Sequence, residues 1–183
     1  MCPTRARTFV ERVHAVDDAL DAWALSHRGP VADAVFYSLS SAADHSILWF
    51  ALGAVQSATR GDVTRGLRLA TAIAGESILT NGIVKTFFRR VRPRSETEGP
   101  LPYGMRRPIT SSFPSGHATS AFMAAVMLSE GSNLGPLLFA LAAAVSASRV
   151  YVRLHHASDV VAGAAFGLAL GMVARRVIPD PSR

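Results

Sequence analysis

Residues 160–177 read VVAGAAFGLALGMVARRV, an apolar run that ends with two arginines near its last position. Such a run is typical of a helix that is buried or crosses a membrane. Four other apolar runs precede it, at 47–58, 67–88, 118–128 and 137–147. The pattern predicts an all-α, membrane-embedded helical bundle of about five spans, although several runs are shorter than the ~20 residues that a free-standing span needs.

The N-terminal region differs from these runs because its apolar residues alternate with charged ones. Over residues 5–27 the apolar side chains recur every three or four positions, which predicts an amphipathic helix lying on the membrane interface or on the bundle. It has no apolar core followed by a cleavage site, so we do not expect a secretory signal. We expect one domain over residues 1–183, with the catalytic bundle over about 45–177.

Composition narrows the class of partner. Charged residues make up 17% of the chain, hydrophobic residues 49%, and the net charge is +6. This balance favours an anionic partner such as a lipid headgroup or a membrane surface. Nucleic acid is disfavoured because the arginines flank apolar helices instead of alternating with aromatic residues. With Cys2 as the only cysteine, we expect no disulfide framework and no thiolate metal site, and the oligomeric state is not predicted.

Three polar clusters interrupt the apolar runs: KTFFRRVRP at 85–93, PSGH at 114–117 and SRVYVRLHHASD at 148–159. The first closes one predicted helix, the second opens the next, and the third joins the last two. If successive helices alternate in direction, all three clusters meet at the same end of the bundle.

The first cluster supplies two cations. Lys85, the only lysine in the chain, precedes Arg92 by seven residues, or two helical turns. Both side chains therefore lie on one face if the helix continues to Pro93, and together they can hold phosphate oxygens. A basic belt at the membrane edge would explain the same residues.

The second cluster opens an apolar helix. Ser115 is suited to cap that helix, and the first backbone N–H groups then point at an anion with the helix dipole behind them. Gly116 leaves room for close approach, and His117 stands at the rim with a side chain that titrates near neutrality. A plain helix start with a neighbouring histidine is the alternative.

The third cluster combines Arg149, His155 and Asp159. The carboxylate follows His155 by one helical turn, so it can accept the Nδ1 proton and leave Nε2 free to attack phosphorus. His156 is an equally close candidate for this role. A metal site built from His155, His156 and Asp159 is the other functional interpretation, but the spacing matches no common metal motif.

Taken together, the clusters resemble the type 2 phosphatidic acid phosphatase superfamily, whose pattern is Lys-x6-Arg-Pro, then Pro-Ser-Gly-His, then Ser-Arg-x5-His-x3-Asp. Every position of this pattern is filled. The resemblance implies a metal-independent phosphatase without a cofactor, in which His155 is the nucleophile, Asp159 orients it and His117 protonates the departing alcohol. It also implies that the phosphoryl oxygens are bound by Lys85, Arg92, Ser115, Gly116 and Arg149.

We therefore expect a lipid phosphate phosphatase that acts through a phosphohistidine on phosphatidate, phosphatidylglycerophosphate or a polyprenyl (pyro)phosphate. The resemblance further implies a multi-pass protein of the cell membrane with its active site on the extracytoplasmic side. Two alternatives are a non-catalytic membrane protein that binds lipid phosphates, and a soluble acid phosphatase or haloperoxidase of the same superfamily.

Overall fold

The computed structural model describes residues 8–93, 102, 105 and 108–178. Over these residues the chain is all-α, as predicted, with seven α-helices: α1 (Phe9–Ser26), α2 (Pro30–Ala42), α3 (Ile47–Arg60), α4 (Val63–Ser77), α5 (Gly116–Leu128), α6 (Gly135–Tyr151) and α7 (Ala157–Val177). Most of the loop expected at 95–108 and the first residues of the N-terminal helix, 5–7, lie outside the described residues.

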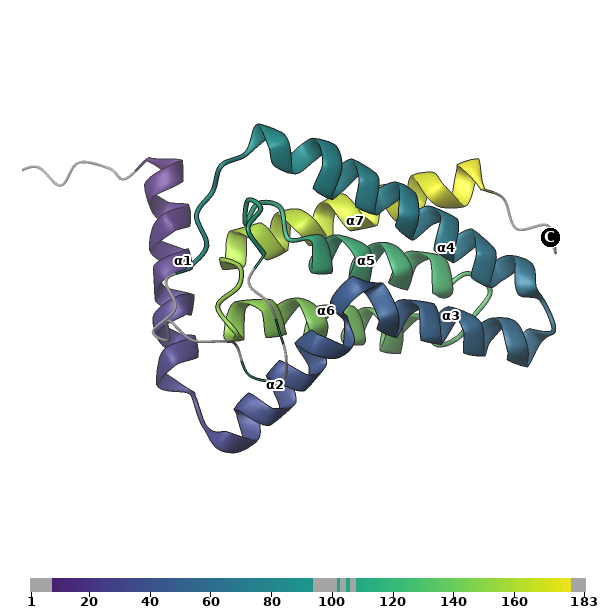
Figure 1. The fold of residues 1–183 in the computed structure, drawn as a ribbon, viewed down its shortest axis with the longest axis horizontal. Helices are drawn as coiled ribbons and strands as arrows, with labels where there is room; N and C mark the ends of the chain where they lie inside the picture. The colour runs from purple at the N-terminus through teal and green to yellow at the C-terminus, as the bar shows by residue number, and fades with distance from the viewer. Residues whose placement is uncertain (1–7, 94–101, 103–104, 106–107, 179–183) are drawn as a thin grey trace, which may run out of the picture.

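Helices α3 to α7 run alongside one another, and α1 lies across one end of this bundle (Figure 1). Helix α5 is the central element, because it packs against α3, α4, α6 and α7. Nearly all of its side chains are buried, which is the pattern of a helix that is apolar all round. The core around it is built from side chains such as Trp49, Leu69, Met123 and Val145.

Helix α4 does not continue regularly to its predicted end at Phe88. It passes into a π-helical turn, η2 (Ile78–Ile83), and then a 3₁₀ turn, η3 (Val84–Phe87). From Phe88 the chain is extended. The condition under which Lys85 and Arg92 would share a helical face is therefore not met. Residues 88–93 bond instead to the segment before α5, where the Ser112 N–H donates to the Arg90 carbonyl at 3.0 Å.

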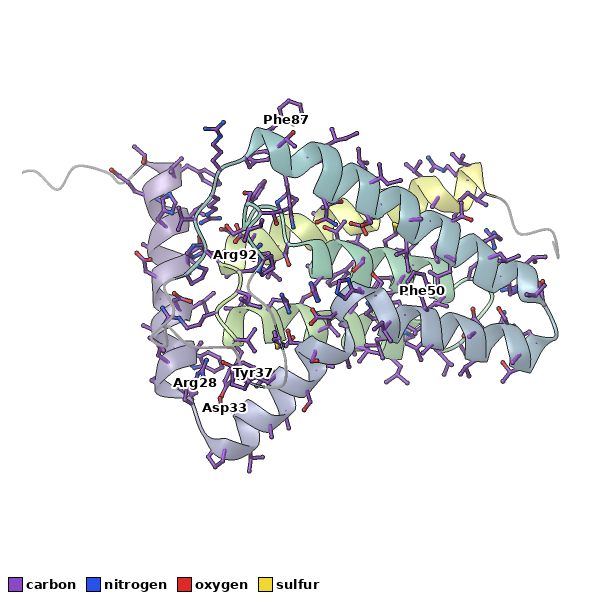
Figure 2. All side chains as sticks on the ribbon, in the orientation of Figure 1. Arg28, Asp33, Tyr37, Phe50, Phe87 and Arg92 are labelled. Carbon is purple, nitrogen blue, oxygen red and sulfur yellow. The ribbon has the colours of Figure 1, made fainter. Side chains whose placement is uncertain are left out.

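Helix α1 is amphipathic, as predicted, but its side chains are arranged in an unexpected way. It begins at a capping box in which the Thr8 hydroxyl and the Glu11 carboxylate each accept a backbone N–H. Its acidic side chain Asp17 is buried against the bundle, whereas the apolar residues Phe9, Val16, Leu20 and Trp23 are exposed. At the junction with α2, Arg28, Asp33 and Tyr37 come together against α6, where the Tyr151 hydroxyl donates to Asp33 at 2.8 Å (Figure 2).

Among the described helices, one is long and apolar enough to cross a membrane by itself, namely α7. Helices α5 and α6 are apolar but shorter. The outer faces of the bundle nevertheless expose large apolar side chains, including Phe50 on α3, Leu67 on α4 and Met172 on α7. Exposed apolar surface of this extent is typical of a lipid or protein interface.

Three glycines of α7, Gly163, Gly167 and Gly171, bring this helix close to α5. A Cβ added to Gly163 would lie 2.5 Å from the Ser115 carbonyl oxygen, and one added to Gly167 would overlap the Thr119 carbonyl. Small residues at such positions let two backbones approach directly. This contact runs along α5 from Ser115 to Val126.

We expect Gly167→Ala to destabilise the protein by about 1–3 kcal/mol, because the added methyl group has no space against Thr119. The matched control is Gly75→Ala in α4, where an added Cβ meets nothing within 4 Å. The control should be neutral or slightly stabilising, since alanine favours the helix. Thermal unfolding in detergent measures both, and equal unfolding temperatures for the two variants would contradict the close contact.

Candidate active site

The N-terminus of α5 carries the second cluster of the candidate site. Ser115 is its N-cap residue, as predicted, and its hydroxyl accepts the Ala118 N–H at 3.5 Å. The Ser115 N–H in turn donates to the Asp159 carbonyl at 3.0 Å, which fixes the start of α5 against α7. A Cβ on Gly116 would lie 3.4 Å from Asn81 Oδ1 and 3.7 Å from Lys85 Nζ. The glycine therefore keeps the ends of η2 and η3 close to the helix start.

His155 lies in the turn between α6 and α7 and is almost fully buried, with an exposed fraction of 2%. Its Nδ1 donates to the Ser112 carbonyl at 2.7 Å, a partner that can only accept. The predicted hydrogen bond from Nδ1 to Asp159 is not formed, because that carboxylate oxygen is 3.8 Å away. The Ser112 bond itself sets the tautomer. The Nε2 lone pair then accepts a hydrogen bond from Arg92 Nη1 at 3.2 Å, which an attacking Nε2 would exchange for its bond to phosphorus.

Burial lowers the pKa of His155 to about 3, and the positive charges of Arg149 and Arg92 act in the same direction, although the Asp159 carboxylate opposes them. The imidazole is therefore neutral over the whole physiological pH range. A neutral ring with an unprotonated Nε2 is the form that can attack an electrophile.

Arg92 and Lys85 both reach the site, although they do not share a helix. Arg92 Nη1 donates to the Leu154 carbonyl at 2.6 Å and lies 3.2 Å from His155 Nε2. Figure 2 shows Arg92 at the end of the bundle next to α1. Lys85 lies beside the start of α5, with its Nζ 3.7 Å from the place of a Cβ on Gly116. One cation is therefore next to His155 Nε2 and the other next to the start of α5.

Lys85 should give the site a pH dependence. Burial, with a further contribution from the charge of Arg92, lowers the pKa of Lys85 to about 8. The ammonium is charged below that pH and loses its proton above it, so KM for a phosphate ester should rise as the pH increases through about 8. Lys85→Arg should move this rise to higher pH, because arginine stays protonated. KM measured against pH tests this, and an unchanged profile in the arginine variant would exclude Lys85 as its origin.

The remaining predicted cation, Arg149, comes from α6 and is 1% exposed. Its Nη1 bonds to the Ser40 hydroxyl of α2 and lies 3.8 Å from the Asp44 carboxylate. The same carboxylate oxygen accepts from His117 Nε2 at 2.8 Å. Asp44 therefore joins the second and third clusters.

Asp44 was not among the predicted site residues. It lies in the 3₁₀ turn η1 (Asp44–Ser46), where His45 and Ser46 both have positive φ angles, 52° and 61°. Such backbone is strained for residues other than glycine and often occurs at functional sites. Burial would raise the pKa of Asp44, but the hydrogen bond from His117 and the charge of Arg149 together lower it, so the carboxylate is ionised. The helix break at Asp44 was the available sequence signal.

His156, the competing candidate, points elsewhere. Its Nε2 lies 3.2 Å from the Val91 carbonyl, and its backbone N–H donates to Asp159 Oδ2 at 2.9 Å. Among the described residues, no three histidine, cysteine, aspartate or glutamate side chains are grouped as a metal site would require. The geometry thus favours His155 over His156 and gives no support to the metal interpretation.

The predicted phosphate-binding residues and both candidate catalytic histidines therefore lie at one end of the bundle. Sequence comparison assigns this arrangement to a known family: the model of the PAP2 superfamily matches residues 65–183. The chain belongs to the PAP2 superfamily and is a PAP2-type phosphatase.

Individual relatives agree with this assignment. The chain is 30% identical to the decaprenylphosphoryl-5-phosphoribose phosphatase of Mycobacterium tuberculosis over 135 residues. This aligned region covers 74% of this chain and 74% of the relative. It is 31% identical over 126 residues to the enzyme of that name from Mycolicibacterium smegmatis, covering 69% of this chain and 68% of the relative.

Two crystal structures have the same fold. A transmembrane PAP2-type phosphatidylglycerolphosphate phosphatase from Bacillus subtilis superposes with a TM-score of 0.73 at 25% identity, covering 94% of this chain and 90% of that one. Aquifex aeolicus LpxE superposes with a TM-score of 0.68 at 26% identity, covering 96% and 99%.

Proposed function

We propose that this PAP2-type phosphatase hydrolyses a phosphate monoester carried by a membrane lipid, through a phosphohistidine formed at His155. The observation that carries this proposal is the surroundings of His155 Nε2. The ring is neutral, its proton is held on Nδ1 by Ser112, and Nε2 faces Arg92 at 3.2 Å. A nucleophile set beside a guanidinium is suited to attack an anionic phosphorus centre.

The reaction proceeds in two displacements. In the first, Nε2 of His155 forms a bond to phosphorus while the bond from phosphorus to the alcohol oxygen breaks. Lys85, Arg92 and Arg149, with the N–H groups at the start of α5, stabilise the phosphoryl oxygens as their charge redistributes. In the second, water attacks phosphorus, the N–P bond breaks, and inorganic phosphate leaves.

His117 is the proposed proton donor and acceptor of these steps. Its Nε2 is engaged by Asp44 at 2.8 Å, so Nδ1 is the ring atom left to exchange a proton with the substrate. Protonation of the alcohol oxygen assists departure in the first step, and removal of a proton from water assists the second. The Asp44 carboxylate would stabilise His117 while it carries the additional proton.

We propose that the lipid is one with a large polyprenyl or diacyl anchor and that the phosphate is terminal. The relatives that share about 30% of their residues with this chain carry the name of a polyprenyl-linked phosphoribose phosphatase. A polyprenylphosphoryl-5-phosphoribose is therefore the first substrate to test. Cleavage would release inorganic phosphate and leave the ribose hydroxyl on the lipid.

A membrane location fits this substrate. We propose that α3 to α7 lie in the bilayer with their exposed apolar faces toward lipid, and that the site opens on the extracytoplasmic side. Short helices such as α5, with 13 residues, are accommodated because they pack inside the bundle. Reporter fusions to the C-terminus test the orientation: cytoplasmic reporter activity is expected, and an exported reporter would reverse the assignment.

The purified protein in detergent should release phosphate from one or more members of a lipid panel in the presence of EDTA. The panel contains phosphatidate, phosphatidylglycerophosphate, polyprenyl phosphate and polyprenylphosphoryl-5-phosphoribose. Loss of activity on chelation would contradict the metal-independent mechanism. Saturable binding of these lipids without turnover of any of them would instead support a lipid-phosphate-binding protein.

A further inference from the structure

A chain of ion pairs connects α1 to the carboxylate next to the nucleophile. Arg90 Nη1 lies 2.7 Å from Asp159 Oδ1, and its Nη2 lies 2.6 Å from Asp17 Oδ2. Asp17 also accepts from the Ser158 N–H at 2.8 Å and from the Ser158 hydroxyl at 2.7 Å. One guanidinium therefore bridges two carboxylates, one on α1 and the other on α7.

This bridge is too well buried to be an ordinary surface contact. The side chains of Asp159 and Asp17 are 0% and 2% exposed, and that of Arg90 is 21% exposed. Burial would raise the pKa of Asp17, but the hydrogen bonds from Ser158 and Arg90 outweigh it and lower the pKa, so the carboxylate is charged. Removing one member of such a group leaves an uncompensated buried charge, which is costly.

The position of Asp17 makes the bridge unexpected. It lies outside residues 65–183, the part of the chain that the family model matches. Neither Asp17 nor Arg90 is a defined position of the Lys-x6-Arg-Pro, Pro-Ser-Gly-His or Ser-Arg-x5-His-x3-Asp pattern. The start of α7, where Asp159 and Ser158 stand, is thus held by a helix from the other end of the chain.

We propose that Arg90 and Asp17 are positioning residues of the phosphatase and act through Asp159. This inference rests on the proposed function. Arg90 fixes the Asp159 carboxylate at its place 3.8 Å from His155 Nδ1. Asp17 offsets the charge of Arg90, so that the three groups together keep one net negative charge beside the ring.

That net charge matters in the first chemical step. When Nε2 of His155 bonds to phosphorus, the ring still carries its Nδ1 proton and becomes cationic. A negative charge near Nδ1 stabilises this ring more than it stabilises the neutral ring before attack. Without Asp17, the charges of Arg90 and Asp159 cancel and this selective stabilisation is lost. The phosphate-binding cations are unchanged, so substrate binding should be retained.

The test compares Asp17→Asn with Asp21→Asn in the full-length chain. Asp21 is the matched control, because it also lies on α1 and pairs with an arginine, but that arginine is Arg153, at 3.1 Å, and not Arg90. The substrate is the lipid of the panel above that the native chain hydrolyses fastest. The readouts are kcat, KM, the rate of phosphoenzyme formation after rapid acid quench, and the unfolding temperature.

We expect Asp17→Asn to lower kcat and phosphoenzyme formation by about 100-fold, the size expected when one group that stabilises developing charge is lost, with KM close to native. Asp21→Asn should keep near-native kcat. Equal losses in the two variants would mean that α1 is merely docked by these pairs, and native kcat in Asp17→Asn would also overturn the proposal.

Arg90→Lys is the second variant, and it remains informative if Asp17→Asn does not fold. Lysine keeps the charge but lacks the planar fork that bridges two carboxylates, so kcat should fall while KM is retained. Native kcat in Arg90→Lys would overturn the proposal. Failure of the proposed function gives a different result, because His155→Ala would then retain activity. The positioning role of Arg90 and Asp17 can therefore fail separately from the mechanism at His155.

Discussion

His155→Ala should lower kcat by about 10⁴-fold or more, because the variant lacks the imidazole proposed to form the N–P bond and losing one member of a catalytic unit costs about as much as losing them all. The acid-quenched native protein should carry labelled phosphate after mixing with substrate, and the variant should carry none. Binding of substrate should persist, since the cations Lys85, Arg92 and Arg149 remain.

His156→Ala is the matched control for this experiment. It removes the adjacent imidazole, which contacts the Val91 carbonyl and not the phosphate-binding groups. We expect this variant to form the phosphoenzyme and to turn over substrate at a rate near the native one. Labelled phosphate in His155→Ala, or its loss in His156→Ala alone, would reassign the nucleophile.

The second large effect is expected at His117. His117→Asn should lower kcat on an alkyl phosphate by about 10²- to 10⁴-fold, the range for loss of a general acid or base. The loss of phosphoenzyme formation should be much smaller on para-nitrophenyl phosphate, because nitrophenolate departs without being protonated. Single-turnover rates on the two esters therefore identify the proton donor.

Asp44→Asn should show the same dependence on the leaving group with a smaller loss, since it acts through its 2.8 Å hydrogen bond to His117. A variant at Ser129, in the turn before α6 and far along α5 from the site, serves as the control and should behave as the native chain. Equal losses on both esters in His117→Asn would indicate a binding role in place of proton transfer.

Much of the site follows from local sequence. The Ser115 cap joins two residues only three positions apart, Ser115 and Ala118, so it could be predicted without knowledge of the fold. The alternation of apolar helices predicted that three distant clusters meet at one end. The convergence of Lys85, Arg92, Gly116 and His155 agrees with that expectation.

The errors arose where distant backbone decides the outcome. Residues 88–93 leave the helix because they bond to the segment at 111–112, and no local pattern reveals that pairing. Nδ1 of His155 bonds to the carbonyl of Ser112, and every residue has a carbonyl, so the sequence could not single out this acceptor. Asp44 and Asp17 lie 73 and 142 residues from His117 and Asp159, and neither belongs to a motif.

The span prediction illustrates a different limit. Length and hydropathy test whether a single helix could cross a membrane by itself. Among the described helices, only α7 is long and apolar enough. Helix α5 is shorter and nearly all of its side chains are buried by neighbouring helices, whereas α6 buries one face and exposes side chains such as Leu137 on the other. Composition alone cannot reveal how much of a helix its neighbours cover.

The glycine contact between α5 and α7 also has a use in protein engineering. Because the starts of α5 and α7 are joined backbone to backbone, by the Ser115 N–H bond to Asp159 and the close approach at Gly163, they form a part that can be kept intact while its surroundings are redesigned. Substitutions on the exposed face of α3, at positions such as Phe50, leave that part unchanged.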